Sequence, residues 1–249
     1  MKSPGRPFSK VKSLVREGWN QRSYLYRPEG ARKDGTEHAN REYEQWLSPI
    51  LTQLPRGSHV LDLGCGAGVP AARLLARRFE VTGVDISDVQ IERARALVPR
   101  ATFVREDMTR VRFPAGSFAA VVALYSIIHV PLAEQRPLFR RIHRWLVPGG
   151  VFLTILGAGR WKGLEKGWLG SDSWMFWDHE DATTYRAWLE EAGFVVDAEK
   201  FIPEGEGGHE LFQVHRPRGP TRGSTRASPA TARRAVQNGR TKHPGPRSP

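Results

Sequence analysis

One stretch, residues 58–68, constrains the fold of this 249-residue chain more than any other. It reads Ser-His-Val-Leu-Asp-Leu-Gly-Cys-Gly-Ala-Gly, a short apolar run followed by three alternating glycines. The apolar run is typical of a buried parallel strand. The glycines let the backbone turn tightly and approach a ligand, and a helix directly behind them offers free N–H groups. The stretch therefore predicts a strand–turn–helix site for a nucleotide-type ligand, with an ordinary glycine-rich turn as the alternative.

Apolar runs and helical patterns alternate along the rest of the chain. Strands are expected at 80–85, 101–105, 118–125 and 151–156, and helices at 37–54, 69–78, 87–97, 131–146 and 181–192. Two more strands, at 194–201 and 209–215, form a hairpin across a glycine-rich turn. The sequence therefore predicts an α/β fold, a Rossmann-like doubly wound sheet of about seven strands, mostly parallel, with a C-terminal antiparallel hairpin strand.

The formal net charge of +12 is concentrated at the two ends of the chain. Residues 1–16 hold five basic residues and no acid, and residues 216–249 hold nine and no acid. The part between them has 24 basic against 26 acidic residues, so its composition gives no reason to expect a phosphate-binding face. We therefore expect a basic flexible arm at 1–16, one folded domain at 17–215 and a basic disordered tail at 216–249.

The single cysteine, Cys65, excludes an internal disulfide and a multi-cysteine zinc site, and no metal site is expected. Its place in the glycine turn favours a small packing residue over a catalytic thiol. No signal peptide is recognisable, and the longest mostly apolar run, 118–130, is too short to cross a membrane. A cytoplasmic protein with no membrane partner is the default expectation.

Residues 157–180 interrupt the alternation of strands and helices. They contain four of the eight tryptophans, Trp161, Trp168, Trp174 and Trp177. A loop of this length inside a compact domain usually has a function, often as a lid or a pocket wall. We expect a wall for an apolar or aromatic substrate, with simple packing of the loop onto the sheet edge as the alternative.

The order of motifs over residues 18–215 resembles that of bacterial class I S-adenosylmethionine (SAM)-dependent methyltransferases of the small-molecule type. Residues 60–68 are similar to the first motif of the family, and residues 81–87 (Val-Thr-Gly-Val-Asp-Ile-Ser) to the second. Glu106-Asp107-Met108 fits the adenine-binding position, and 118–130 fits the fourth strand. The turn Leu-Val-Pro-Gly-Gly at 146–150 resembles the entry to the fifth.

The resemblance implies SAM as cofactor and a set of residues that hold it. In this assignment the glycine turn approaches the amino acid end of SAM, Asp62 anchors it, Asp85 accepts from the ribose hydroxyls and Asp107 accepts from the adenine amino group. The implied cofactor-binding residues are Tyr26, Asp62, Gly64, Cys65, Gly66, Gly68, Asp85, Ile86, Asp107, Met108 and Tyr125.

Two residues near the fourth strand are the candidates for chemistry on the acceptor. Tyr125 ends the strand, where the methionine end of SAM and the acceptor would meet. His129 follows at the carboxyl edge, and its ordinary pKa suits proton transfer. Packing of His129 against the next helix is the alternative. The implied reaction is transfer of a methyl group to a small-molecule acceptor.

Two other functions remain open from the sequence. The glycine–aspartate spacing also fits an NAD-dependent oxidoreductase, although no Tyr-x-x-x-Lys pair occurs in the chain. The arginine-rich tails would also suit a SAM-binding protein or methyltransferase tethered to nucleic acid by non-specific contact.

Deletion of residues 217–249 distinguishes a small-molecule enzyme from a tethered one. Because the tail has almost no large apolar residue and cannot fold alone, we expect the shortened protein to keep its rate of methyl transfer. Rates of the full and shortened chains, measured side by side with a small acceptor, test this. A fall of tenfold or more would contradict it.

Overall fold

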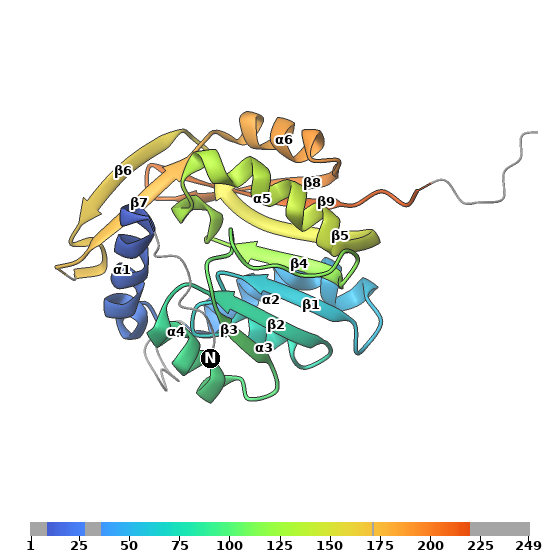
Figure 1. Cartoon of the computed structure of the whole chain (residues 1–249), viewed down its shortest axis with the longest axis horizontal. Helices are drawn as coiled ribbons and strands as arrows, with labels where there is room; N and C mark the ends of the chain where they lie inside the picture. Colours follow the sequence, from blue (N-terminus) through green and yellow to red (C-terminus); the bar gives the residue numbers. More distant parts are fainter. Residues whose placement is uncertain (1–8, 28–35, 171, 220–249) are drawn as a thin grey trace, which may run out of the picture. The chain divides into compact units, whose positions relative to one another are not determined.

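A seven-stranded sheet forms the centre of the computed structural model, which describes residues 9–27, 36–170 and 172–219. Its strands lie in the order β3-β2-β1-β4-β5-β9-β8, and β9 runs antiparallel to both its neighbours while β1 to β5 are parallel (Figure 1). This arrangement confirms the predicted mostly parallel sheet with an antiparallel hairpin strand. The strands are β1 (His59–Leu63), β2 (Glu80–Asp85), β3 (Thr102–Arg105), β4 (Phe118–Leu124), β5 (Leu146–Gly157), β8 (Val195–Glu204) and β9 (Gly207–His215).

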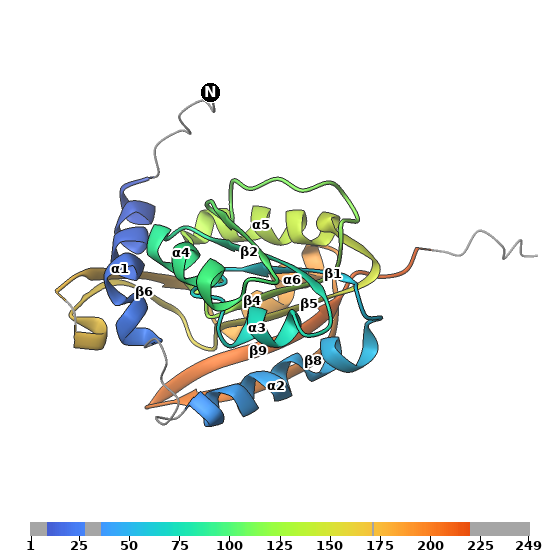
Figure 2. The same ribbon diagram turned by 90° about the horizontal axis from the view of Figure 1, so that it is seen from below.

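Helices cover both faces of this sheet because its strands are apolar on both sides. Val60 and its neighbours on one face pack with α2 (Thr36–Gln53), α3 (Ala71–Leu75) and α4 (Asp88–Leu97). Leu61 and its neighbours on the other face pack with α5 (Leu132–Trp145) and α6 (Ala182–Glu191). Figure 2 shows α2 and α5 on opposite sides of the strands. Among the described residues, no helix combines the length and apolar character needed to cross a bilayer.

Two helices have a side chain that caps their N-terminus. Ser87 accepts a hydrogen bond from the backbone N–H of Gln90 at the start of α4 (3.1 Å). Asp181 accepts one from Thr184 at the start of α6 (2.8 Å). Such caps satisfy N–H groups that the first helical turn leaves without partners.

The prediction of a flexible arm over residues 1–16 is wrong for its second half. Helix α1 (Lys10–Tyr26) begins after Ser9, which accepts from the backbone N–H of Lys12. The side chain of Lys12 is buried against the domain, 5 % exposed. Residues 10–16 are therefore part of the folded unit, while residues 1–8 lie outside the described part of the chain.

The tryptophan-rich segment is not a loop. It forms a two-stranded antiparallel sheet of β6 (Trp161–Lys166) and β7 (Trp174–His179), with short 3-10 turns at Ile127–His129 (η1) and Trp168–Gly170 (η2) nearby in the fold. Figure 1 shows this hairpin beside α1, at the end of the molecule to which β4 points. The hairpin and α1 thus lie where the carboxyl ends of the parallel strands converge.

The predicted start of the tail at residue 216 is also too early. The backbone N–H of Arg216 donates to the carbonyl of Gly150 (2.9 Å), and its guanidinium donates to the carbonyl of Leu146 (2.6 Å). The folded unit therefore continues past the end of β9. The remainder of the predicted tail, residues 220–249, lies outside the described residues.

Buried arginines fasten α1 to the domain. Arg22 is fully buried and donates to the backbone oxygens of Trp168 (2.6 Å) and Ser173 (2.7 Å) in the β6–β7 segment. Arg93 of α4 donates to the backbone oxygens of Ser23 and Arg27. The N-terminal helix is thus tied to two parts of the chain that lie more than 60 residues away.

Replacement of Arg22 tests whether these hydrogen bonds stabilise the fold. In Arg22→Met the partly buried carbonyls of Trp168 and Ser173 lose the hydrogen bonds that Arg22 donates to them, so the free energy of unfolding should fall by about 1–3 kcal/mol. Urea denaturation measures the loss, with Gln21→Met on the exposed side of α1 as control. Equal losses in the two variants would show that Arg22 contributes nothing specific.

Candidate functional site

A cavity of about 370 Å³ opens at the carboxyl ends of β1, β2 and β4. Its walls include Gly64 just after β1, Asp85 at the end of β2 and Tyr125 just after β4. Open α/β sheets generally bind ligands at this edge, and the volume suits a molecule of nucleotide size. Eleven of the twelve residues predicted from the sequence line it: Tyr26, Asp62, Gly64, Cys65, Gly66, Asp85, Ile86, Asp107, Met108, Tyr125 and His129.

The glycine turn closes one side of the cavity. Gly64 has φ +75°, and a Cβ there would lie 2.2 Å from the Cβ of Ser126, so only glycine fits. Gly68, the twelfth predicted residue, does not line the cavity. A Cβ at Gly68 would meet Phe103 and Val98 at 3.1 Å, so this glycine allows close packing against the end of α4 and β3.

Cys65 lies in the same turn as a packing residue. Its side chain is buried, and burial raises the pKa of its thiol well above the ordinary value. A nucleophilic cysteine requires the opposite shift, because the thiolate is the reactive form. The structure therefore favours the packing interpretation over a catalytic thiol.

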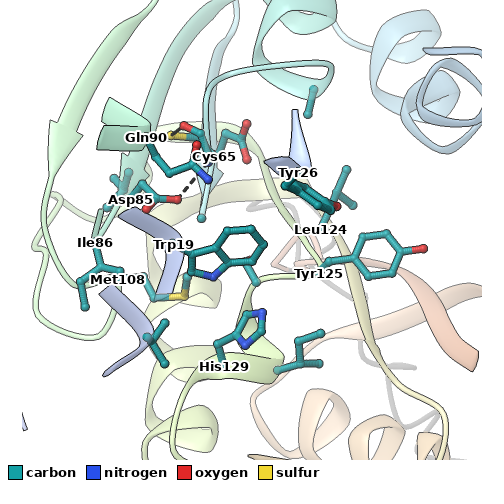
Figure 3. Close-up of a pocket in the computed structure, with 18 of the residues that line it drawn as sticks. Trp19, Tyr26, Cys65, Asp85, Ile86, Gln90, Met108, Leu124, Tyr125 and His129 are labelled. Atoms are coloured by element: carbon teal, nitrogen blue, oxygen red, sulfur yellow. Dashed lines mark hydrogen bonds between the residues drawn. The ribbon is translucent and has the colours of Figure 1, made fainter. Parts of the chain in front are cut away.

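Two carboxyl groups stand side by side at the turn. Asp85 accepts from the backbone N–H of Gly66 (2.9 Å) through Oδ2 and from that of Ser87 (2.8 Å) through Oδ1 (Figure 3). Asp62 is 2 % exposed, and its Oδ2 has no hydrogen-bond partner among the described residues. Burial, and then the charge of Asp85, raises the pKa of Asp62 to about 7, and burial raises that of Asp85 to about 6.

The wall on the β2 and β3 side combines apolar side chains with one fixed carboxylate. Ile86 and Met108 lie on the same side of the cavity (Figure 3). Asp107 accepts from the Lys12 ammonium (2.7 Å) and from the backbone N–H of Thr109 (2.8 Å). Lys12 also donates to Glu134 (2.6 Å), so one buried lysine joins α1 to the start of α5 and to the turn after β3.

Aromatic rings form the opposite wall. Trp19 of α1 lies 5.2 Å from Tyr26 and 5.6 Å from Trp168, centroid to centroid, and Trp168 lies 5.3 Å from Trp177. All four rings line the cavity. The other two tryptophans of the 157–180 segment, Trp161 and Trp174, are instead exposed. The segment therefore supplies half of its tryptophans to the cavity wall.

His129 is buried next to these rings, 4.3 Å from Trp177 and 5.6 Å from Trp19 (Figure 3). Its Nδ1 lies 2.8 Å from the carbonyl oxygen of Phe176. Because a carbonyl only accepts, Nδ1 carries the proton and Nε2 keeps a free lone pair. Burial lowers the pKa of His129 to about 4, so the ring is neutral at physiological pH.

Tyr125 stands in a strained conformation at the end of β4. Its φ of +56° lies in the left-handed region, which non-glycine residues rarely adopt. Such strain is concentrated at functional sites, where the surrounding structure holds it. The Tyr125 ring lies 5.0 Å from His209 and 6.0 Å from Trp46, and Figure 3 shows its hydroxyl pointing away from Trp19.

The lining residues are strongly acidic overall. Among the described residues, six carboxyl groups line the cavity (Glu42, Asp62, Asp85, Glu106, Asp107 and Glu204), against two cations (Lys12 and Arg27). With Lys12 already paired with Asp107, the remaining field favours a positively charged ligand. The described residues contain no group of three potential metal-ligating side chains.

Sequence analysis missed several lining residues. Lys12 was assigned to a flexible arm, and neither Trp19, Glu204 nor His209 belongs to a recognisable motif. Only Trp19 could have been suspected from the sequence, because it lies in a cluster of aromatic residues (Trp19, Tyr24 and Tyr26) ahead of the first predicted strand. The other three are polar residues far from the motifs, and only the fold brings them to the cavity.

Comparison with known proteins supports a common family. Residues 60–150 match the family model described as a methyltransferase domain. The chain is 32 % identical over 152 residues to a sterol 24-C-methyltransferase of Gibberella zeae, covering 58 % of this chain and 39 % of that protein. It is 37 % identical over 109 residues to a 2-methyl-6-phytyl-1,4-hydroquinone methyltransferase of Synechocystis, covering 42 % of this chain and 33 % of that protein. The chain thus spans less than half the length of these curated relatives.

Solved structures share the fold. A [4+2]-cyclase, SpnF, superposes with a TM-score of 0.67 at 20 % identity over 86 % of this chain and 98 % of that one. Magnesium protoporphyrin IX methyltransferase of Synechocystis, with bound S-adenosylhomocysteine (SAH), gives 0.64 at 16 % identity over 83 % and 99 %. At these identities the likeness shows the architecture alone, and one architecture serves two reactions.

The fold and the cavity define an α/β protein with a nucleotide-type site at the carboxyl edge of its sheet. Over residues 60–150 the chain is similar to methyltransferase domains, and its relatives include sterol and hydroquinone methyltransferases. This similarity agrees with the resemblance seen in its motifs.

The unpartnered carboxyl of Asp62 predicts a stability gain. Since its folded pKa of about 7 lies above the unfolded value, ionisation of Asp62 lowers the stability of the ligand-free protein as pH rises from about 4 to 7. Asp62→Asn should therefore be more stable than the parent by more than about 1 kcal/mol at pH 8, and by much less at pH 5.

Urea denaturation of the ligand-free protein at the two pH values measures this difference. Asp172→Asn, at an exposed position, serves as the control. A stability gain for Asp62→Asn that is the same at pH 5 and pH 8 would contradict the assignment of a buried, unpaired charge.

Proposed function

We propose that this protein transfers a methyl group from SAM to a small-molecule acceptor. The observation that carries the proposal is the buried carboxyl of Asp62, whose Oδ2 has no hydrogen-bond partner among the described residues, at a cavity in which acids outnumber cations. A ligand with positive charge would give Oδ2 a partner and would favour the ionised form of Asp62. SAM has such charge at its sulfonium and amino groups, and two solved neighbours hold SAM or SAH.

The residues at the glycine turn fit the polar parts of SAM. In our assignment Asp62 and the turn at 64–66 face the amino acid end. Each Asp85 oxygen already accepts one backbone N–H and keeps a further lone pair for a ribose hydroxyl. Ile86 and Met108 enclose the adenine, with Asp107 accepting from its amino group. Tyr26 covers the site from α1.

The chemistry of the donor is simple, so the protein's task is placement. SAM supplies a methyl group that is already activated by its positively charged sulfur. Trp19 and Tyr26 cover the cavity and exclude water, and the fixed network around Asp107 holds the walls in place. Alignment of donor and acceptor alone can supply several kcal/mol of the rate enhancement.

The acceptor we propose is an apolar or aromatic small molecule. Its support is the wall of four aromatic rings, which offers stacking surface with few polar groups. The names of two relatives, a sterol and a hydroquinone methyltransferase, describe acceptors of this kind. In this proposal the Nε2 of His129 accepts a hydrogen bond from the acceptor and orients it. Tyr125 forms the wall where donor and acceptor meet.

The alternatives have less support. The two phosphates of NAD would meet an acidic cavity, which disfavours an NAD-dependent oxidoreductase. Tethering to nucleic acid depends on residues 220–249, which lie outside the described part of the chain. We retain the expectation of a cytoplasmic enzyme as part of this proposal, because a single cysteine suits a reducing compartment.

Calorimetric titration tests the cofactor assignment. We expect micromolar binding of SAM and SAH and no binding of NAD. Asp85→Ala should weaken SAM binding at least tenfold, because it removes acceptors for the ribose hydroxyls. Asp88→Ala removes the same charge three residues away, on the exposed start of α4, and should bind SAM like the parent protein. Binding of NAD in place of SAM would refute the proposal.

A further inference from the structure

A second histidine lies at the acceptor end of the cavity, paired with a carboxylate. His209, at the start of β9, and Glu204, at the end of β8, both line the cavity. The Nδ1 of His209 lies 3.4 Å from Glu204 Oε2. The β8–β9 hairpin fixes this pair, because residues 204 and 207 face each other at its turn and residue 209 pairs with Ile202.

This pairing determines which nitrogen of His209 is available. A carboxylate attracts an N–H, so Nδ1 carries the proton and Nε2 has the free lone pair. The neighbouring His209 side chain, and to a smaller extent the Tyr125 hydroxyl, hold the pKa of Glu204 below its ordinary value, which keeps this carboxyl ionised at neutral pH. Separations above 3.2 Å are common for catalytic hydrogen bonds in ligand-free proteins.

Tyr125, just after β4, contacts both members of the Glu204–His209 pair. Its hydroxyl interacts with Glu204, and its ring meets the His209 ring edge to face at 5.0 Å. The strained backbone of Tyr125 directs the ring toward this hairpin and away from Trp19 (Figure 3). Tyr125 just after β4, Glu204 of β8 and His209 of β9 thus lie together at the cavity wall.

His129 is less suited to remove a proton. It is fully enclosed, its Nδ1 is bound to a backbone carbonyl, and no carboxylate is hydrogen-bonded to it. A neutral carbonyl stabilises an imidazolium much less than an ionised carboxylate does. His209 has the carboxylate that His129 lacks.

We infer that His209, oriented by Glu204 and Tyr125, is the catalytic base that takes the proton from the methyl acceptor. This inference rests on the proposed methyl transfer. In the step, the acceptor atom forms its bond to the methyl group, the electron pair of the breaking sulfur–carbon bond stays on sulfur, and the acceptor's proton passes to Nε2 of His209. Acceptors that must lose a proton, such as phenols, amines and thiols, are therefore the substrates this site would use.

Other polar and aromatic side chains face His209. Glu204 faces it from β8, and Tyr125 faces it from just after β4. His179 of β7 lies 6.3 Å away, ring to ring. Glu204 is the one carboxylate in contact with His209 among the described residues, so it is the group to replace in a test.

The tautomer of His209 provides a test that needs no acceptor. The full chain is labelled with ¹⁵N and saturated with SAH, and its histidine side chains are read by long-range ¹H–¹⁵N spectra. His209→Gln identifies the signals. We expect protonated Nδ1 and bare Nε2 for His209, and a shift toward the other tautomer in Glu204→Gln.

The outcomes separate the two proposals. A protein that binds no SAH in calorimetry refutes the proposed function and, with it, this inference. A protein that binds SAH but has a protonated Nε2 on neutral His209, or an unchanged tautomer in Glu204→Gln, refutes the base alone.

Kinetics provide the second readout, with phenol, catechol, aniline and thiophenol as acceptors. His209→Gln should lower kcat about 100-fold or more and leave SAM affinity unchanged. The matched control is His215→Gln, since His215 pairs with Asp197 (2.8 Å) on the same hairpin without lining the cavity. An unchanged kcat in His209→Gln refutes the base. If none of the four acceptors reacts, the NMR measurement of the His209 tautomer tests the inference by itself.

Discussion

The carboxylate of Asp85 joins the elements on which the site depends. It accepts from the glycine turn after β1 through Gly66 and from the start of α4 through Ser87. Ser87 in turn caps α4 and donates to Asn20 of α1 (2.6 Å). A single half-buried acceptor therefore aligns two strand ends, one helix start and, through Ser87, the covering helix. The cost of burying this group appears as its raised pKa, and the backbone donors offset part of that cost.

Helix α1 covers the cavity through polar contacts more than apolar ones. Lys12 reaches the carboxylates of Asp107 and Glu134, and Arg22 reaches the carbonyls of the β6–β7 segment. Such contacts are directional, so they fix one position of α1 on the domain, whereas an apolar face would allow the helix to slide. The position of α1 in turn places Trp19 and Tyr26 in the cavity wall.

The elements that could be predicted from the sequence are those whose buried side chains form an apolar run or recur at the spacing of a helix or a strand. Strand β4 is buried almost throughout, and its apolar run identifies it. The buried face of α1 instead includes Lys12 and Arg22, which hydrophobic periodicity assigns to the solvent side, so no helix was predicted there and residues 10–16 were assigned to a flexible arm. Strand β6 is exposed along most of its length and has no alternation to detect. The cavity position of most of the proposed cofactor residues was predictable because they follow strands within motifs, whereas Glu204 and His209 come together only through the hairpin register.

The cavity is encoded in two separable portions of the chain. Under the proposed function, the strand ends that face the donor lie within residues 60–150, the stretch matched by the family model. The groups proposed to surround the acceptor lie mostly outside it, on α1, the β6–β7 hairpin and the β8–β9 hairpin. Substitutions in these outer segments can reshape the acceptor pocket while Asp62 and Asp85 keep their surroundings. Substrate choice in this architecture can therefore diverge by exchange of peripheral segments, with the donor machinery inherited intact.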